Sequence, residues 1–138
     1  SGANLTKQRA NYTLSSQAHD DGSRHHMLFQ GPLPSGSAFH TENEKGAHII
    51  IDLDGLCEVR ALNIVNRSNI HERAAGLTVW ASTNKREWEE IWQADSVQGS
   101  WQIRLQRPVR ASHLKVGLPE DTKNFLHLRA VDAYGKRL

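Results

Sequence analysis

A short polar segment between two runs of alternating apolar residues holds the side chains best suited to chemistry. Residues 66–73, "NRSNIHER", combine two guanidinium groups, an imidazole, a carboxylate and two amides. An arginine fork can reach two adjacent hydroxyls or a carboxylate, while histidine and asparagine add directional donors and acceptors. Sugar hydroxyls both donate and accept hydrogen bonds, so a sugar site needs such a mixture. The segment therefore favours binding of a hydroxyl-rich ligand.

The same residues also have a structural interpretation. Arg67 could simply pair with Glu72, and Arg73 could cap a loop and contact strand carbonyls. We interpret Asn66 as structural, and we interpret Arg67, His71 and Arg73 as ligand-binding residues.

Catalytic motifs are absent from the sequence. There is no G-x-S-x-G elbow, no H-E-x-x-H pair, no phosphate loop and no evident cysteine–histidine pairing. Glu72 lies beside two arginines and is expected to be an ionised carboxylate, which suits pairing better than general acid chemistry. We therefore expect a protein that is not an enzyme.

Size and charge limit the choice of class. The chain has 138 residues, which suits one domain over residues 1–138, with residues 1–14 as an N-terminal segment. Ser1 and Gly2 are typical of a remnant of cloning, so we expect further sequence before them. Lys and Arg total 17 against 15 Asp and Glu, a surplus too small to indicate nucleic acid.

Cysteine content and hydropathy bear on compartment and membranes. Cys57 is the single cysteine, so no internal disulfide can form, and its strand-like surroundings predict a packed thiol. No apolar run approaches the roughly 18 to 20 residues that span a bilayer. Only "HHMLF", residues 25–29, offers an apolar loop tip, so membrane binding is not expected.

Short strands with polar turns between them are the elements that position the polar side chains of residues 66–73. Alternating apolar residues predict strands over five segments, namely 48–53, 58–66, 77–82, 101–106 and 112–118. Residues 84–93 have helical spacing, but their surroundings favour a turn at Asn84-Lys85 followed by a strand. Six or more short strands indicate an all-β sandwich or barrel.

Several aromatic and histidine residues fit this frame rather than a site. We expect them to be core, sheet-face or surface residues: Trp80, Trp88, Trp92, Trp101, His48, His113 and His127.

Five segments in order resemble the discoidin superfamily: "GAHIIIDLDG", "LNIVNR", "LTVWASTNKREWEEIW", "SWQIRLQRPVRASHLKVGL" and "LHLRAVDAYG". This family includes coagulation-factor type C domains, galactose-binding-like carbohydrate-binding modules and F-type lectins. The resemblance covers about residues 15–136. It implies an antiparallel jelly-roll β-sandwich of about eight strands, with ligands held by loops at one end.

Within that family, the segment "RSNIHER" is similar to the second half of the F-type lectin fucose motif. Arg67 and Arg73 match its two arginines, Asn69 stands where the family has Asp, and the gap to Arg73 is one residue short. The resemblance implies that His40 and the loops 23–30 and 119–125 complete the site. Further candidates from these segments are Arg24, His25, Glu72 and Phe125, with Phe29 and Phe39 as other aromatic platforms for a sugar.

Many members of the family hold a structural Ca²⁺. Asp21 and Thr41 match two of its ligand positions, but Ala130 stands at the position of the expected Glu, beside the cation of Arg129. Ca²⁺ prefers six to eight oxygen ligands, often with a chelating carboxylate, so we expect this site to be weakened.

We therefore predict a non-catalytic module that binds a terminal sugar or glycan, with an acidic or sulfated glycan as one class of ligand. We expect a larger bacterial enzyme or surface protein, secreted or on the cell surface, as its parent. The alternatives are docking against another domain or protein and, third, phospholipid binding.

Overall fold

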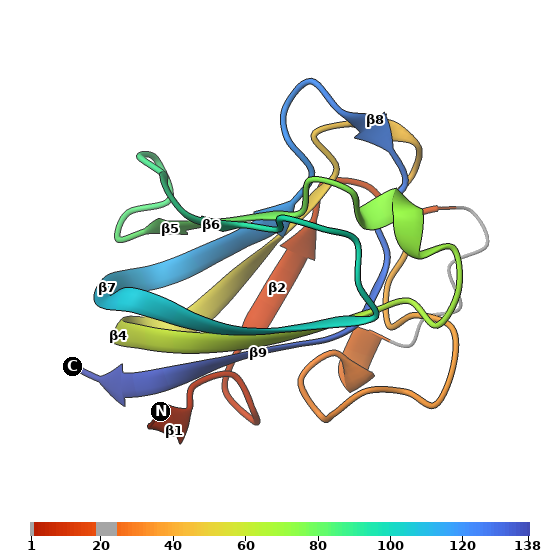
Figure 1. The fold of residues 1–138 in the computed structure, drawn as a ribbon. Coiled ribbons are helices and arrows are strands. Elements are labelled where there is room, and N and C mark those ends of the chain that lie inside the picture. Colours follow the sequence, from red (N-terminus) through yellow and green to blue (C-terminus); the bar gives the residue numbers. More distant parts are fainter. Residues whose placement is uncertain (1, 19–24) are drawn as a thin grey trace.

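A computed structural model shows an antiparallel β-sandwich and describes residues 2–18 and 25–138 (Figure 1). The strands are β1 Ala3–Asn4, β2 Asn11–Leu14, β3 Glu44–Lys45, β4 His48–Asn66, β5 Thr78–Ser82, β6 Glu89–Gln93, β7 Ser100–Gly117, β8 Lys123–Asn124 and β9 Leu128–Arg137, with 3₁₀ turns η1 His25–Met27 and η2 His71–Ala74. Neither turn has the length and apolarity that crossing a membrane requires, and the described part of the chain contains no other helix.

Two long strands connect the layers of the sandwich. β4 pairs with β7 along nearly its whole length, from His48↔Gly117 to Val65↔Ser100. The first part of β4 also pairs with β2, and the last part of β7 pairs with β5, which itself pairs with β6. The second part of β4 instead pairs with β9, which pairs with β1. Both strands therefore fold over and belong to both layers (Figure 1).

The core consists of the alternating apolar residues of these strands. Leu62, Ile64 and Ile103 are almost fully buried, as are Val79 and Leu114. Apolar side chains on one face of each strand therefore close the space between the layers. The predicted all-β sandwich is confirmed. The predicted turn before β6 is also confirmed, because Lys85 has a positive φ of 65° and residues 89–93 form a strand.

The tryptophans are core or sheet-face residues, as predicted. Trp101 is buried and packs edge to face on Trp92, with ring centroids 6.2 Å apart. The ammonium group of Lys115 lies 4.8 Å from the ring centroid of Trp80 and 5.0 Å from that of Trp88.

The Asp54-Gly55 pair is a bend within β4 rather than the end of a strand. The sequence predicted separate strands over 48–53 and 58–66, but the ladder with β7 only shifts register between Asp52 and Cys57. Asp54 and Gly55 have positive φ values of 58° and 125°, and they belong to the unpaired residues of a bulge in β4. The segments 101–106 and 112–118 likewise merge into β7.

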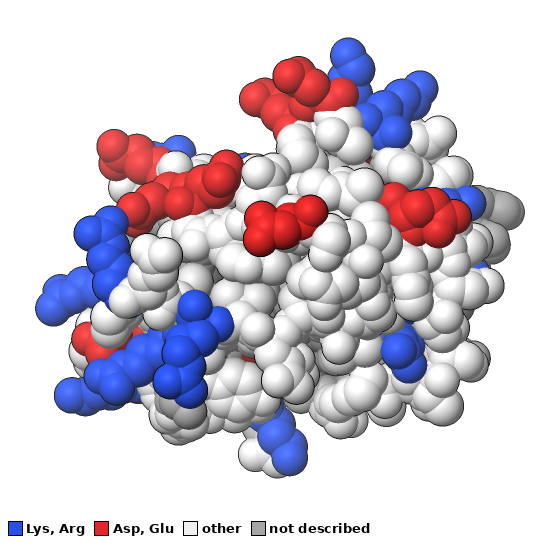
Figure 2. Space-filling view, in the orientation of Figure 1, with Lys and Arg blue, Asp and Glu red and all other residues white. Residues whose placement is uncertain are grey.

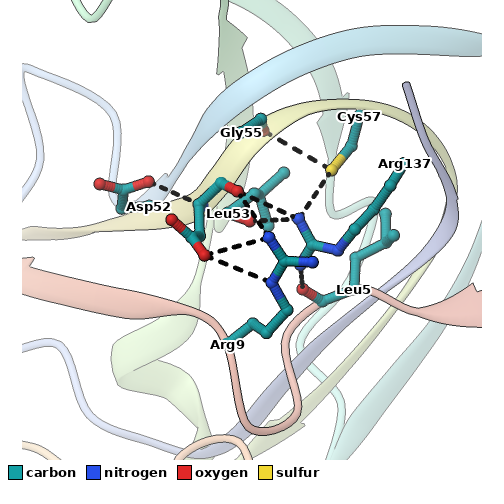
Figure 3. Close-up of polar contacts among 8 residues, drawn as sticks. Leu5, Arg9, Asp52, Leu53, Gly55, Cys57 and Arg137 are labelled. Atoms are coloured by element: carbon teal, nitrogen blue, oxygen red, sulfur yellow. Dashed lines mark hydrogen bonds and ion pairs between the residues drawn. The ribbon is translucent and has the colours of Figure 1, made fainter.

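Arg137 fastens this bend to the N-terminal segment (Figure 3). One of its guanidinium nitrogens donates to the carbonyl of Leu53 at 2.7 Å, and the other donates to the carbonyl of Leu5 at 2.8 Å. Arg9 reaches the same bend from outside and pairs with the exposed carboxylate of Asp54 at 3.1 Å. The guanidinium of Arg137 therefore satisfies one carbonyl next to the bend and one of the N-terminal segment.

Cys57 lies beneath this bend and is fully buried, which confirms the predicted packed thiol. Burial raises the pKa of the thiol, and the positive charge of Arg137 acts in the opposite direction. The apolar tip at 25–29 is not a membrane spike, because Leu28 and Phe29 are buried in the core.

Replacing Arg137 with Ala is expected to lower the free energy of unfolding by about 2 kcal/mol, because two carbonyls lose charge-assisted hydrogen bonds. Arg9→Ala is the matched control and is expected to cost less than about 1 kcal/mol, since the Arg9–Asp54 pair is exposed. Urea unfolding of both variants measures the difference, and equal costs would show that Arg137 does not hold the bend.

Candidate functional site

Two segments that lie far apart in the sequence bring His40 and His127 side by side. The backbone N–H of Ala38 donates to the carbonyl of Leu128, and that of Thr41 donates to the carbonyl of Leu126. The hydroxyl of Thr41 accepts a further bond from the N–H of Leu126 at 2.8 Å. As a result, the rings of His40 and His127 lie 4.9 Å apart.

Asn66 anchors the polar segment at the end of β4. Its side chain is fully buried, and its amide nitrogen donates to the carbonyls of His71 and Gln98 at 3.2 and 2.9 Å. Its side-chain oxygen accepts the backbone N–H of Arg67 at 2.8 Å. The backbone carbonyl of Asn66 also accepts from the guanidinium of Arg129. These contacts support the structural role that the sequence predicted for Asn66.

Arg67 follows this anchor and is half-buried, and Asn69 orients it. The Nε of Arg67 donates to the side-chain oxygen of Asn69 at 2.9 Å. Ile70, the next residue, has a φ of 55°, which is rare for a β-branched side chain. The strained backbone turns the chain into η2 and places Arg73 on the same side as Arg67 near His127.

Arg73 lies over an aromatic ring supplied by the loop before β9. Its guanidinium carbon is 4.6 Å from the ring centroid of Phe125, and its Nη1 is 3.5 Å from Nε2 of His127. Phe125 also packs edge to face on His40, with centroids 5.3 Å apart. Arg73 and Phe125 are both half-buried, so each keeps surface for a ligand.

His127 is the buried centre of this cluster, with 1% of its surface exposed. Burial lowers the pKa of His127 to about 3, and the positive charges of Arg67, His40 and Arg73 act in the same direction. A guanidinium can only donate, so the neutral imidazole offers Nε2 as the acceptor to Arg73. Its Nδ1 is buried without a hydrogen-bond partner in the described structure.

The site cluster, as we name it, therefore consists of His40, Arg67, Asn69, Arg73, Phe125 and His127. Five of these were predicted from the sequence. His127 was missed as a site residue, because it was assigned to a strand pattern, whereas it immediately precedes β9. Nothing in the sequence indicates that the imidazole of His127 is buried among the arginine and aromatic side chains of other segments.

Other candidates lie elsewhere or outside the description. A Cβ on Gly99 would lie only 3.5 Å from Cε1 of His71, so this ring packs against the β6–β7 connection. Glu72 is exposed, and Arg67 bonds Asn69 rather than Glu72 among the residues described. Two predicted residues lie outside the described residues, namely Asp21 and Arg24, and His25 is described only as the start of η1.

Two of the predicted aromatic platforms are wrong. Phe39 is fully buried and Phe29 is 9% exposed, and both belong to the hydrophobic core. Of the three candidates, Phe125 alone remains half-exposed beside the guanidinium groups.

The residues of the expected calcium site that the structure describes do not fit Ca²⁺. The hydroxyl of Thr41 donates to the carbonyl of Glu42 and accepts from Leu126, so internal bonds already use it. Ala130 is fully buried and supplies no side-chain oxygen, and Arg129 beside it is bound to backbone carbonyls. Within residues 2–18 and 25–138, no group of three His, Cys, Asp or Glu side chains is arranged to hold a metal.

Solved structures with a similar fold include lectin domains and binding modules. The lectin domain of lectinolysin complexed with Lewis B antigen has a TM-score of 0.80 and 19% identity, over 96% of each chain. A Streptococcus pneumoniae fucose binding module has a TM-score of 0.75 and 20% identity, over 98% of this chain and 96% of that one. The Clostridium perfringens module CpGH89CBM32-5, in complex with GalNAc-β-1,3-galactose, has a TM-score of 0.71 and 15% identity, over 96% and 99%.

A scan of protein-family models and a search of curated proteins gave no match. The structural similarities cover nearly the whole chain at low identity. The chain therefore has the β-sandwich fold of these lectin domains and binding modules, and the fold that the sequence resemblance implied is confirmed.

The buried imidazole is expected to make the protein less stable in acid. Because the pKa of His127 is lowered to about 3 in the folded state, the unfolded chain binds more protons between about pH 6.5 and pH 3. Stability attributable to His127 is therefore complete above pH 6.5 and falls as the pH decreases, by at most about 1.4 kcal/mol per pH unit.

His127→Gln is expected to flatten this dependence in urea unfolding series at several pH values. His26→Gln, which removes an exposed histidine, is the control and should keep the wild-type slope. Equal slopes for the wild type and His127→Gln would contradict the assignment of a buried neutral imidazole.

Proposed function

We propose that the chain is a non-catalytic carbohydrate-binding module that recognises a terminal sugar of a glycan through the site cluster. The observation that carries this proposal is the pair of half-buried guanidinium groups of Arg67 and Arg73, held at one end of a rigid sandwich. Among the described residues, neither pairs with a carboxylate or a backbone carbonyl. Both therefore keep donors for a ligand.

Each residue of the cluster has a part that suits a sugar. The two arginines offer planar forks to adjacent hydroxyls or to a carboxylate, and His40 lies beside them. The ring of Phe125 supplies an apolar face for the C–H side of a sugar ring. Because Arg73 already covers part of that ring, the sugar would meet the exposed remainder. Thr41 and Asn66 hold the backbone of both segments, so the cluster is formed before the ligand arrives.

The solved structures with this fold support the proposal. Among them are a lectin domain complexed with Lewis B antigen and a fucose binding module. Residue types in the site cluster match the arginines of the F-type lectin motif, with Asn69 in place of its Asp. Asn69 still orients Arg67 but adds no negative charge, so the cluster retains a positive field that suits an acidic sugar.

Arg73→Ala is expected to abolish binding on a glycan array without lowering the melting temperature appreciably, because it removes a ligand donor and leaves the anchors intact. Arg86→Ala is the matched control, since it removes the same charge from an exposed turn. The array is run with and without a calcium chelator, and binding is expected to be unchanged by the chelator. Unchanged binding of Arg73→Ala would retire the site, and an array with no hits beside a crosslinked protein partner would favour a docking module.

Asn69→Asp tests the charge of the ligand. Aspartate can still accept the bond from Arg67, but its negative charge opposes an acidic ligand. We expect the variant to bind galacturonate several-fold more weakly than the wild type does, and to bind galactose with unchanged affinity. Isothermal titration of the two sugars with both proteins measures this. Equal weakening of both sugars would indicate a distorted loop rather than a charge effect.

A further inference from the structure

A second group of polar side chains lies on the outer face of the layer formed by β9, the second part of β4 and the first part of β7. Two rows of cross-strand partners, from β7 through β4 to β9, are Arg104–Ala61–Tyr134 and Gln102–Asn63–Asp132. The residues between them, such as Leu62, Ile103 and Ala133, are buried in the core. Because side chains alternate along a strand, both rows face away from the core.

The residues of these rows other than Asp132 line an open hollow of about 460 Å³. Its floor is low because Ala61 is flanked by the much larger Arg104 and Tyr134. A register shift between Val59 and Ala61 occurs in the ladders with both β7 and β9, and such bulges redirect side chains near binding sites. The volume lies in the range of small-molecule sites.

Polar groups around the hollow are available to a ligand. In the part of the chain that the structure describes, the side chains of Asn63, Gln102 and Arg104 make no hydrogen bond or ion pair. Asp132 differs, because it accepts from Asn4 and Thr6 and is buried. Two neighbouring amides, one guanidinium and one half-buried phenol ring therefore converge without internal partners.

Charge on this face is positive. Beyond Arg104, the next row consists of Arg110, Glu58 and Lys136, and Glu58 is already paired with Arg60 at 2.8 Å. Figure 2 shows Lys and Arg side chains gathered at the lower left, over the end where β4, β7 and β9 lie together in Figure 1. An anionic ligand would therefore be attracted to this face.

We propose that this hollow is a second saccharide-binding site, and that its ligand carries a carboxylate or sulfate group. Asn63 and Gln102 each offer a donor and an acceptor to ring hydroxyls, Arg104 binds the anionic group, and the ring of Tyr134 faces the sugar. The proposal is independent of the site cluster, with which the hollow shares no residue.

Other polyanions fit the hollow less well. Single-stranded nucleic acid is bound by several stacked aromatics and a row of cations, whereas one tyrosine lines this hollow. A protein partner needs a surface of about 800 Å² per side, with apolar anchors. The two amides, the single guanidinium and the single aromatic ring of the hollow suit a ligand that has many hydroxyl groups and few negative charges.

The test uses NMR titration of the Arg73→Ala protein, so that binding at the site cluster does not contribute. The probes are a heparin tetrasaccharide, trigalacturonate and neutral galactotriose. We expect at least one acidic probe to shift the amide resonances of residues 61–63, 102–104 and 134 at millimolar concentration, and galactotriose to shift them at least about tenfold more weakly. Sulfated and uronate probes distinguish the two sources of negative charge.

The double variant Gln102→Ala/Arg104→Ala is expected to lose these shifts, and Ala61→Leu is expected to reduce them by filling the floor. Gln106→Ala/Arg107→Ala removes the same residue types from the same strand and should retain them. The proposal is overturned if no acidic probe shifts these resonances, if the control pair loses them equally, or if galactotriose or a polyglutamate peptide produces equal shifts.

Discussion

The fold depends on the pairing of β4 with β7 along nearly their whole length. These strands have 19 and 18 residues, and each belongs to both layers, so one ladder fixes how the layers face each other. A ladder that crosses between layers must bend. Beside the bend at Asp54-Gly55, the guanidinium of Arg137 donates a hydrogen bond to the carbonyl of Leu53. The other end of β4 is Asn66, from which the polar loop starts. The end of β4 therefore fixes where the polar loop of the site cluster begins.

The neutral imidazole of His127 lies beside the guanidinium of Arg73 and within the field of Arg67. Two arginines side by side repel each other, and a carboxylate between them would neutralise the field that a ligand meets. Burial keeps His127 uncharged, so it accepts from Arg73 without adding or removing charge. Asn69 does the same for Arg67. The cluster holds its cations in place with neutral acceptors, which leaves their charge for the proposed ligand.

The sequence predicted the frame well because alternation records which side of a strand is buried. It predicted Arg67, Asn69 and Arg73 because they are neighbours along the chain. It failed where geometry depends on distant segments: Asp54-Gly55 has turn chemistry in isolation but forms a bulge because β7 continues alongside. His127 could not be recognised, since its partners come from η2, the loop before β3 and the end of β4.

Shallow polar sites of this kind have a common energetic limit. Each hydrogen bond to a sugar replaces one to water, so the net gain per contact is small and ordering costs absorb much of it. A rigid antiparallel frame reduces that cost by presenting side chains already in position. Two such sites on one frame would act on the same glycan with a high effective concentration, which raises avidity without any stronger contact. The geometry of β4 makes this arrangement available, because its end carries the site cluster and its middle carries the floor of the hollow.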